Sequence, residues 1–241
     1  ANPTSDVKGF DTANKLAILS SIAWGSWIKV NDIRVKGIDQ LDVEDVKITS
    51  DFGYVFKLIG SAIKTDKGLD LWVEPCLVDH HHFFANVHNE YNAIMITGDA
   101  CDDVVFYGKG AGQLPAAAAV VSDIIDLSKY VSNGTAGLVQ NVIYSKNKKI
   151  KFLSHGESKS DYYLRFTVVD KPGVLSKISG ILGSYGVSIA SLYQNDRNQD
   201  KKVSIIITTH RALSEHIENA LKEIDKLSIT KAKTVKIRIE D

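Results

Sequence analysis

The stretch YYLRFTVVDKPGVLSKISGILG, residues 162–183, decides the fold of the second half of the chain. Residues 162–169 are rich in aromatic and β-branched side chains, which predicts a strand. The Asp-Lys-Pro-Gly turn at 170–173 follows, and residues 174–183 carry apolar side chains at helical spacing. A strand that leads directly into a helix begins a compact α+β unit.

The sequence after residue 183 supplies the rest of that unit. Strands are predicted at 187–193 and 202–209, with a polar turn between them. Residues 212–226 form an amphipathic pattern, and 234–239 alternate as a last strand. The order is βαββαβ, the ferredoxin-like arrangement. The apolar face of the second helix is formed by Leu213, Ile217, Leu221 and Ile224.

The first half of the chain also mixes helices and strands. Its longest helix begins with a polar turn and continues into an uncharged run that contains Ala17 and Ala23. Asp42 begins an acidic first turn, which favours a helix start. We therefore predict an α+β fold with an open mixed sheet and helices. The predicted strands are 33–38, 54–63, 69–75, 91–97 and 103–107, and the predicted helices are 10–28, 42–51 and 114–130.

Composition restricts the class of protein. A length of 241 residues suggests one large or two ordinary domains. The formal net charge is zero, so nothing favours nucleic acid or an anionic membrane as a partner. Cys76 and Cys101 are the two cysteines, which fits a reducing compartment rather than a disulfide framework. With no apparent signal peptide and no apolar run near the roughly 20 residues of a membrane helix, we predict a cytoplasmic protein.

The segment DVKGFDTANK, residues 6–15, concentrates charge ahead of the first apolar run. Asp11 and Lys15 are four residues apart and share one helix face. Carboxylates near an ammonium favour its charged form, so Lys15 could polarise a substrate oxygen and donate a proton to it. The alternative is an exposed i,i+4 pair that contributes about 0.2–0.5 kcal/mol.

A glycine-rich turn, GKGAGQLP at 108–115, precedes the helix at 114–130. A helix N-terminus can bind an anion. The dinucleotide fingerprint G-x-G-x-x-G would need glycine where Gln113 stands. The alternative is a tight strand-to-helix connection.

Two further clusters could bind ligands. Asp79-His-His-His82 with His88 matches no zinc pattern, and adjacent histidines do not easily point at one ion, so we predict no metal site. The turn at 170–175 leads into a helix whose first N–H groups could receive the carboxylate of a small amino acid. The alternative is an ordinary helix start with Asp170 as the N-cap and Pro172 in the first turn.

Two family resemblances assign roles to these segments. Residues 161–240 resemble an ACT domain, with Asp170-Lys-Pro-Gly-Val-Leu175 and Gly183-Ser-Tyr-Gly-Val-Ser-Ile189 at matching places. Residues 2–130 resemble homoserine dehydrogenase, whose signature is similar to NPTSDVKGFDTANKLAIL at 2–19. Tyr91-Asn-Ala-Ile94 and the 108–115 turn follow where that family carries them, although Ala116 and Ala118 replace the family's usual hydroxyl residues.

The homoserine dehydrogenase resemblance implies NAD(P)-dependent interconversion of L-homoserine and L-aspartate 4-semialdehyde, an oxidoreductase step in threonine and methionine biosynthesis. It implies Lys15 as proton donor, Asp6 as its catalytic support and Asp11 as a substrate ligand. The turn Gly110-Ala111-Gly112 would border the nucleotide. The ACT resemblance implies feedback control by threonine. The implied effector residues are Asp170, Gly173, Val174, Leu175 and Asn195.

These resemblances predict how the chain is organised. We expect a substrate-binding and catalytic domain at 1–130, a linker at 131–160 with one strand at 137–143, and an ACT domain at 161–241. The family's nucleotide-binding domain would lie ahead of residue 1, so the chain alone is predicted to be inactive. ACT modules generally pair, so we expect a homodimer or higher homo-oligomer, with 187–193 or 203–209 as edge strands. The alternative is a non-catalytic, ACT-based amino-acid-binding regulator.

Overall fold

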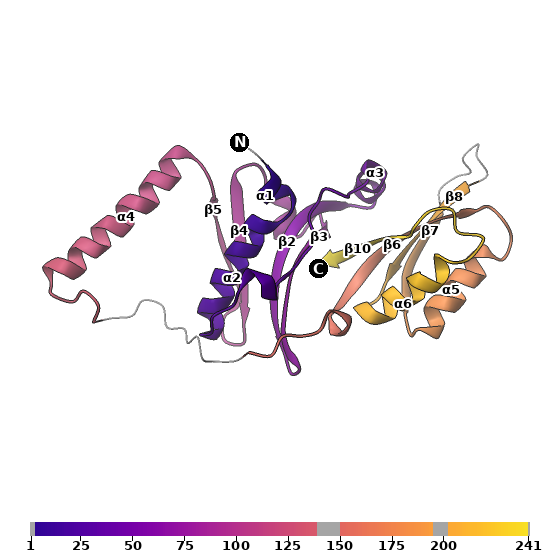
Figure 1. Ribbon diagram of the computed structural model, residues 1–241. Helices are drawn as coiled ribbons and strands as arrows, with labels where there is room; N and C mark the ends of the chain where they lie inside the picture. Colours follow the sequence, from indigo (N-terminus) through magenta and orange to yellow (C-terminus); the bar gives the residue numbers. More distant parts are fainter. Residues whose placement is uncertain (1–2, 139–149, 195–201, 241) are drawn as a thin grey trace. The chain divides into compact units, whose positions relative to one another are not determined.

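The computed structural model describes residues 3–138, 150–194 and 202–240 (Figure 1). The chain divides into two compact units, one formed by residues 1–79 and 145–241 and the other by residues 80–144. Each unit has its own sheet. The mixed α+β class predicted from the sequence is confirmed.

The first unit is built on one mixed sheet. In the order of the sheet, its strands run β1-β3-β10-β6-β8-β7, while β2 pairs with β3 and the short β9 pairs with β6. The strands are β1 (Arg34–Val35), β2 (Tyr54–Thr65), β3 (Gly68–Asp79), β6 (Lys159–Val169), β7 (Ile189–Gln194), β8 (Lys202–Thr209), β9 (Ala212–Leu213) and β10 (Val235–Glu240).

The predicted βαββαβ unit is present and is continuous with the first half of the chain. Its last strand, β10, pairs antiparallel with β6 and parallel with β3, where Arg238 lies opposite Cys76. The β2–β3 hairpin of the first half therefore extends the same sheet. Pro75, which cannot donate a backbone hydrogen bond, lies between the residues of β3 that pair with β1 and those that pair with β10.

Helices cover both faces of this sheet. α5 (Val174–Ser184) and α6 (Ser214–Ile224) pack on the face formed by the even-numbered residues of β6 (Figure 1). α3 (Val43–Asp51) packs on the opposite face, where Ile48 joins a core with Tyr163 and Ile206. The alternation of side chains along a strand separates these two cores.

The remaining helices of the unit lie at the start of the chain and before β6. α2 (Phe10–Trp24) buries Ala13, Leu16 and Ala17 against β2 and β3. The other short elements are α1 (Thr4–Val7), η1 (Val30–Asp32) and η3 (His155–Glu157).

Several predicted boundaries were wrong. The first helix ends at Trp24 rather than at 28, because Gly25 takes the left-handed conformation with φ of 60° and ends it. The strand predicted at 33–38 is reduced to the two residues of β1. Residues 212–213, predicted as helix, pair with β6 as β9. The helix start at Asp42 is confirmed, since its side chain accepts a hydrogen bond from the Glu44 N–H.

One of the two predicted edge strands is interior. β8 has β6 on one side and β7 on the other, so residues 203–209 offer no free edge within the described sheet. β7 pairs with β8 and lies at the end of the strand order. The hairpin prediction at 54–63 and 69–75 is confirmed, with both strands longer than expected.

The second unit contains the second predicted hairpin. β4 (Tyr91–Gly98) pairs antiparallel with β5 (Asp102–Lys109), and Asp102 takes a positive φ of 48° at the turn. η2 (Phe83–Asn86) precedes the hairpin, and α4 (Gln113–Ser132) follows it. The strand predicted at 137–143 falls largely outside the described residues. Among the described helices, none is long and apolar enough to cross a membrane.

Candidate active site

Gly9 sets the geometry at the start of the first unit. It lies between α1 and α2 with φ of 79°, a conformation that glycine adopts without strain. A Cβ at this position would lie 3.1 Å from Val73 and 3.2 Å from Val35, so the backbone here approaches β3 and β1 closely. The chain can therefore turn from α1 into α2 directly against the sheet.

This turn places the predicted proton donor and one carboxylate together. Lys15 Nζ lies 2.7 Å from Asp11 Oδ2 on the first turns of α2, and the two side chains are 52% and 43% exposed. Asp6 belongs to α1 and is exposed. Within the described residues its carboxylate makes no ion pair with Lys15, so the expected second carboxylate partner is not seen.

The predicted nucleotide-bordering turn lies in the second unit. Gly110, Ala111 and Gly112 connect β5 to α4, and the Gly110 N–H donates to the Glu90 carbonyl at 2.8 Å. A Cβ on Gly110 would lie 1.9 Å from the Asn92 Nδ2, so the turn has no room for a larger residue while Asn92 keeps its position. Gly112 is the N-cap of α4 with φ of 126°.

An ion pair holds the base of this turn. Lys109 Nζ lies 2.9 Å from Glu90 Oε1, and the hydrogen bond from Lys109 lowers the pKa of Glu90. Lys109 also lies over the ring of Tyr91, which stacks on Tyr107. The turn is thus supported on both strands of the hairpin.

The predicted effector loop begins α5. Gly173 is its N-cap residue with φ of 86°, so the alternative with Asp170 at the N-cap position was wrong. Val174 is buried in the core under α5, whereas Leu175 is 37% exposed. Asn195 lies outside the described residues.

The sequence did not reveal a buried charge cluster between α3 and β6. Arg165 Nε lies 2.5 Å from Asp45 Oδ1, and Arg165 Nη2 lies 2.9 Å from Asp45 Oδ2. Their side chains are 7% and 1% exposed. Glu44 and Asp42 each contact the same guanidinium at 3.1 Å, and Tyr163 donates to Asp45. Arg165 lies in a predicted strand otherwise rich in apolar residues, and this could have indicated a buried charge that needs a partner.

Contacts within this cluster raise the pKa values of Arg165 and Tyr163. The hydrogen bonds that Arg165 donates to Asp45 raise the pKa of Arg165, although burial opposes this shift. Burial raises the pKa of Tyr163, and the nearby Asp45 charge adds to that shift. Both groups therefore keep their ordinary protonation state near neutrality, as expected of a structural pair.

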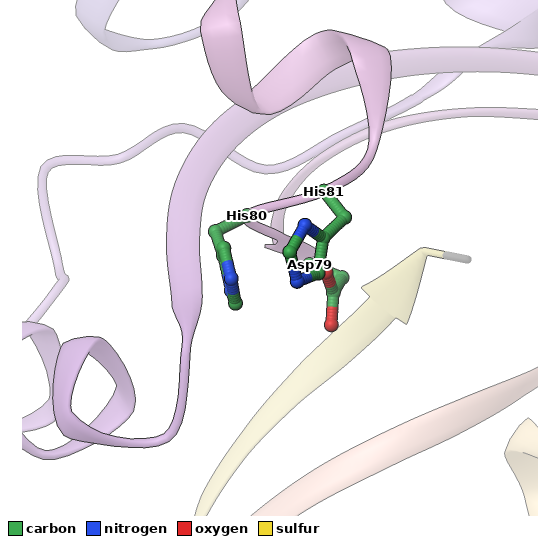
Figure 2. A group of neighbouring side chains, drawn as sticks. All are labelled: Asp79, His80 and His81. Atoms are coloured by element: carbon green, nitrogen blue, oxygen red, sulfur yellow. The ribbon is translucent and has the colours of Figure 1, made fainter.

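The histidine-rich stretch brings three potential ligand atoms together. Asp79, His80 and His81 follow one another, and their donor atoms lie within 4.8 Å of each other (Figure 2). Figure 2 shows the side chains projecting to the same side of the backbone. The neighbouring histidines thus place their ring nitrogens close together, although adjacent histidines do not easily point at one ion. A structural zinc site needs four ligands at about 2 Å, and the absence of a metal here stays a prediction.

Comparison with known families assigns both halves of the chain. Residues 1–125 match the family described as homoserine dehydrogenase, and residues 162–228 match the ACT domain. The homoserine dehydrogenase of Neisseria gonorrhoeae is 35% identical over 242 residues, covering 100% of this chain and 56% of that protein. The homoserine dehydrogenase of Pseudomonas aeruginosa is also 35% identical, with the same shares covered.

Solved structures agree in fold. A homoserine dehydrogenase from Thiobacillus denitrificans aligns with a TM-score of 0.92 and 34% identity, covering 100% of this chain and 55% of that chain. The Staphylococcus aureus enzyme aligns with a TM-score of 0.70 and 29% identity. The chain thus spans a little over half the length of the relatives it matches. Because the family match covers more than half of its residues, the chain belongs to the homoserine dehydrogenase family, with an ACT domain in its second half.

Proposed function

We propose that this chain is the substrate-binding and regulatory portion of an NAD(P)-dependent homoserine dehydrogenase. The reaction interconverts L-homoserine and L-aspartate 4-semialdehyde, on the route to threonine and methionine. The observation that carries the proposal is the 2.7 Å pair between Lys15 and Asp11 at the start of α2. The Lys15 ammonium is half exposed and is held in place by Asp11, so a substrate oxygen can contact it without a conformational change in the protein.

The proposed chemistry is acid–base catalysis at the substrate oxygen. In the direction of reduction, the Lys15 ammonium donates a hydrogen bond and then a proton to the aldehyde oxygen. In the direction of oxidation, the Lys15 amine accepts the hydroxyl proton. Asp11 orients the ammonium and binds the α-amino group of the substrate. Asp6, on the preceding helix, supports the reacting hydroxyl once substrate is bound.

The glycine turn in the second unit fits a nucleotide. Gly110 lets the turn pack closely against Asn92, and Gly112 leads into the first turn of α4, whose N–H groups can face an anion. NAD(P) supplies the hydride acceptor or donor when it is bound. Gly110, Ala111 and Gly112 would border it, while its main binding domain lies outside residues 1–241.

The ACT match supports a regulatory role for the second half of the chain. We propose that residues 1–130 form the substrate domain, 131–160 the linker and 161–241 the ACT domain. Threonine is the proposed effector, received by the loop at 170–175 together with Asn195. The proposed assembly is a homodimer or higher homo-oligomer in the cytoplasm, with β7 as the available edge.

The direct test uses a fusion. The portion of the Neisseria gonorrhoeae relative that this chain does not cover is joined ahead of residue 1, and homoserine oxidation is followed by NAD(P)H absorbance. We expect activity in the fusion and none in residues 1–241 alone. Turnover by residues 1–241 alone would contradict the proposal that the cofactor is bound mainly by the fused portion. A folded, nucleotide-binding fusion without activity, which still binds amino acids, would favour the alternative of a non-catalytic regulator.

A further inference from the structure

An open crevice lies in the first unit where the neighbour of β3 changes. β1 pairs with β3 at Trp72 and Val73, and β10 pairs with it at residues 76–78. Sheet edges at which neighbouring strands diverge leave crevices in which α/β proteins bind ligands. This one has a volume of about 360 Å³, near the lower end of the range of small-molecule sites. Its lining residues are Arg34, Val35, Lys36, Glu74, His155, Glu218 and Lys236.

Some of the charges in the crevice neutralise one another. Glu218 Oε1 lies 3.0 Å from Lys236 Nζ and 2.7 Å from His155 Nε2. Burial raises the pKa of Glu218, but the hydrogen bonds from Lys236 and His155 outweigh it and lower the pKa overall. Arg34 Nη2 lies 2.5 Å from Asp70 Oδ1, and the Asp70 side chain is almost fully buried. Arg34, His155, Glu218 and Lys236 are therefore already paired where they line the crevice.

Two opposite charges in the crevice lack a close partner. In the part of the chain that the structure describes, Lys36 makes no ion pair. The ion contact of Glu74 is with Arg238 Nε at 3.8 Å, which is too long for a hydrogen bond. An ammonium and a carboxylate on the same wall are therefore both open to a ligand.

Lys36 and Glu74 are also neighbours in the sheet. The Lys36 N–H donates to the Val73 carbonyl at 2.8 Å, which continues the parallel register of β1 along β3. Residues 34 and 72 lie opposite each other in this register, so 36 and 74 are the next pair on the same face. Their charged groups nevertheless form no ion pair with each other among the described contacts.

We propose that this crevice binds a free α-amino acid, with its carboxylate on Lys36 and its ammonium on Glu74. A simple anion would leave Glu74 with only its 3.8 Å contact to Arg238, and a simple cation would leave Lys36 without an ion partner among the described residues. A zwitterion satisfies both with charge-assisted hydrogen bonds. The site is distinct from the Lys15–Asp11 pair and from the loop at 170–175, and it does not depend on the reaction proposed above.

Calorimetry on the 241-residue chain tests this assignment. Glycine, L-homoserine, L-threonine and L-aspartate are titrated separately, with acetate and methylammonium as ligands that carry one charge each. We expect at least one amino acid to bind tenfold or more tightly than either single-charge probe. Lys36→Gln and Glu74→Gln should each weaken that binding at least tenfold, because each removes a hydrogen bond to a charged group. The matched control is Lys64→Gln, an exposed strand lysine without an ion pair among the described residues, and it should bind as the parent does.

The outcomes that overturn the site are distinct. No heat at about 10 mM of any amino acid, tenfold above a Kd of about 1 mM, would exclude it. Heat that persists in Lys36→Gln but disappears in Asp170→Asn would place the ligand at the 170–175 loop instead. Equal loss in Lys64→Gln would show a non-specific effect. Lys36 is exposed and its side chain makes no described ion pair, so Lys36→Gln should leave the chain folded. The binding test therefore remains possible with this variant even if Glu74→Gln unfolds.

Discussion

Two cation–carboxylate pairs in the first unit have nearly the same length but opposite surroundings. Lys15 and Asp11 meet at 2.7 Å with about half of each side chain exposed. Arg165 and Asp45 meet at 2.5 Å with almost nothing exposed. The difference shows that distance does not decide what an ion pair does. Access to water decides whether either partner can exchange its contact for a ligand.

The buried pair joins the two halves of the sequence. Asp45 comes from α3, and Arg165 comes from β6, which is 120 residues further along the chain. Leaving either charge alone in the core would be far more unfavourable than losing an exposed pair. The exposed pair joins residues four apart on one helix and contributes little to folding. We therefore expect substitutions at the two pairs to affect different properties.

The largest expected effect is on catalysis. In the active fusion, Lys15→Ala should lower kcat by about 10²–10⁴, the usual contribution of a positioned proton donor. The same change should alter the free energy of unfolding by about 0.5 kcal/mol or less. The control is Lys67→Ala, which removes another exposed pair, with Glu157 at 3.0 Å, and should keep full activity. Near-normal turnover in Lys15→Ala would refute the assigned role.

The next effect is on stability. Asp45→Ala should lower the free energy of unfolding by about 3–5 kcal/mol, because Arg165 then stays charged and buried without its buried partner and keeps only the half-exposed Glu44 and Asp42. Glu44→Ala removes a 3.1 Å contact with the same guanidinium, but Glu44 is 51% exposed, so about 1 kcal/mol or less is expected. Urea unfolding of the 241-residue chain measures both.

The double variant Arg165→Met with Asp45→Leu sharpens this prediction. Apolar replacement of both partners avoids an unpaired buried charge, so most of the lost stability should return. If the double variant is as unstable as Asp45→Ala, packing around α3 rather than charge explains the loss. Equal losses in Asp45→Ala and Glu44→Ala would contradict the role assigned to burial.

A smaller effect is expected at the turn that positions the exposed pair. Gly9→Ala should destabilise the chain by about 1–2 kcal/mol, because a left-handed conformation disfavours a Cβ and Val73 and Val35 are close. Gly180→Ala is the control: nothing lies within 4 Å of its Cβ position within α5, and alanine favours a helix by about 1 kcal/mol over glycine. Thermal unfolding should move in opposite directions for the two variants.

Local signals in the sequence predicted most elements of the fold. Asp42 predicted the start of α3, and the Asp-Lys-Pro-Gly turn predicted the start of α5. Both predictions were possible because capping and turn formation depend on residues only a few positions apart. The end of α2 was misplaced because the uncharged run continues past Gly25 to Ile28, whereas the left-handed conformation of Gly25 ends the helix. Glycine within an apolar run was the signal that the prediction underweighted.

Contacts between distant residues could not be predicted. The parallel pairing of β10 with β3 joins segments about 160 residues apart, and no local pattern specifies such a partner. The same holds for Asp45, which looked like ordinary first-turn acidity but is paired with Arg165. The strand predicted at 69–75 was too short, since β3 continues past Pro75 to Asp79, and Pro75 lies between the residues that pair with β1 and those that pair with β10.

The candidate site was predicted in part. The spacing of Asp11 and Lys15 on a helix is sufficient to predict their pairing, and the structure shows it. Asp6 was expected beside the same lysine, but Gly9 separates α1 from α2 and Asp6 makes no ion pair with Lys15 in the described chain. The juxtaposition of Lys36 and Glu74 depends on the register of β1 along β3, so no local pattern predicts it.

The smallest expected effect concerns an exposed pair and its pH dependence. Ser154 Oγ donates to Glu157 Oε2 at 2.7 Å, and Lys67 lies 3.0 Å from Oε1. The Ser154 hydrogen bond, followed by that of Lys67, lowers the pKa of Glu157 from 4.5 to about 2. The folded state therefore favours the carboxylate, so this contribution is complete above pH 4.5 and is lost as the pH falls toward 2.

Glu157→Gln tests that sign. The variant should be slightly less stable than the parent at neutral pH, and the difference should shrink between pH 4.5 and the lowest pH at which the parent stays folded. Added salt should also shrink it, because exposed charges are screened, whereas the loss in Asp45→Ala should respond little to salt. A difference that grows on acidification would mean that the carboxylate is not stabilised in the folded state. Access to water would then not explain why the exposed and the buried ion pairs differ in their effects on stability.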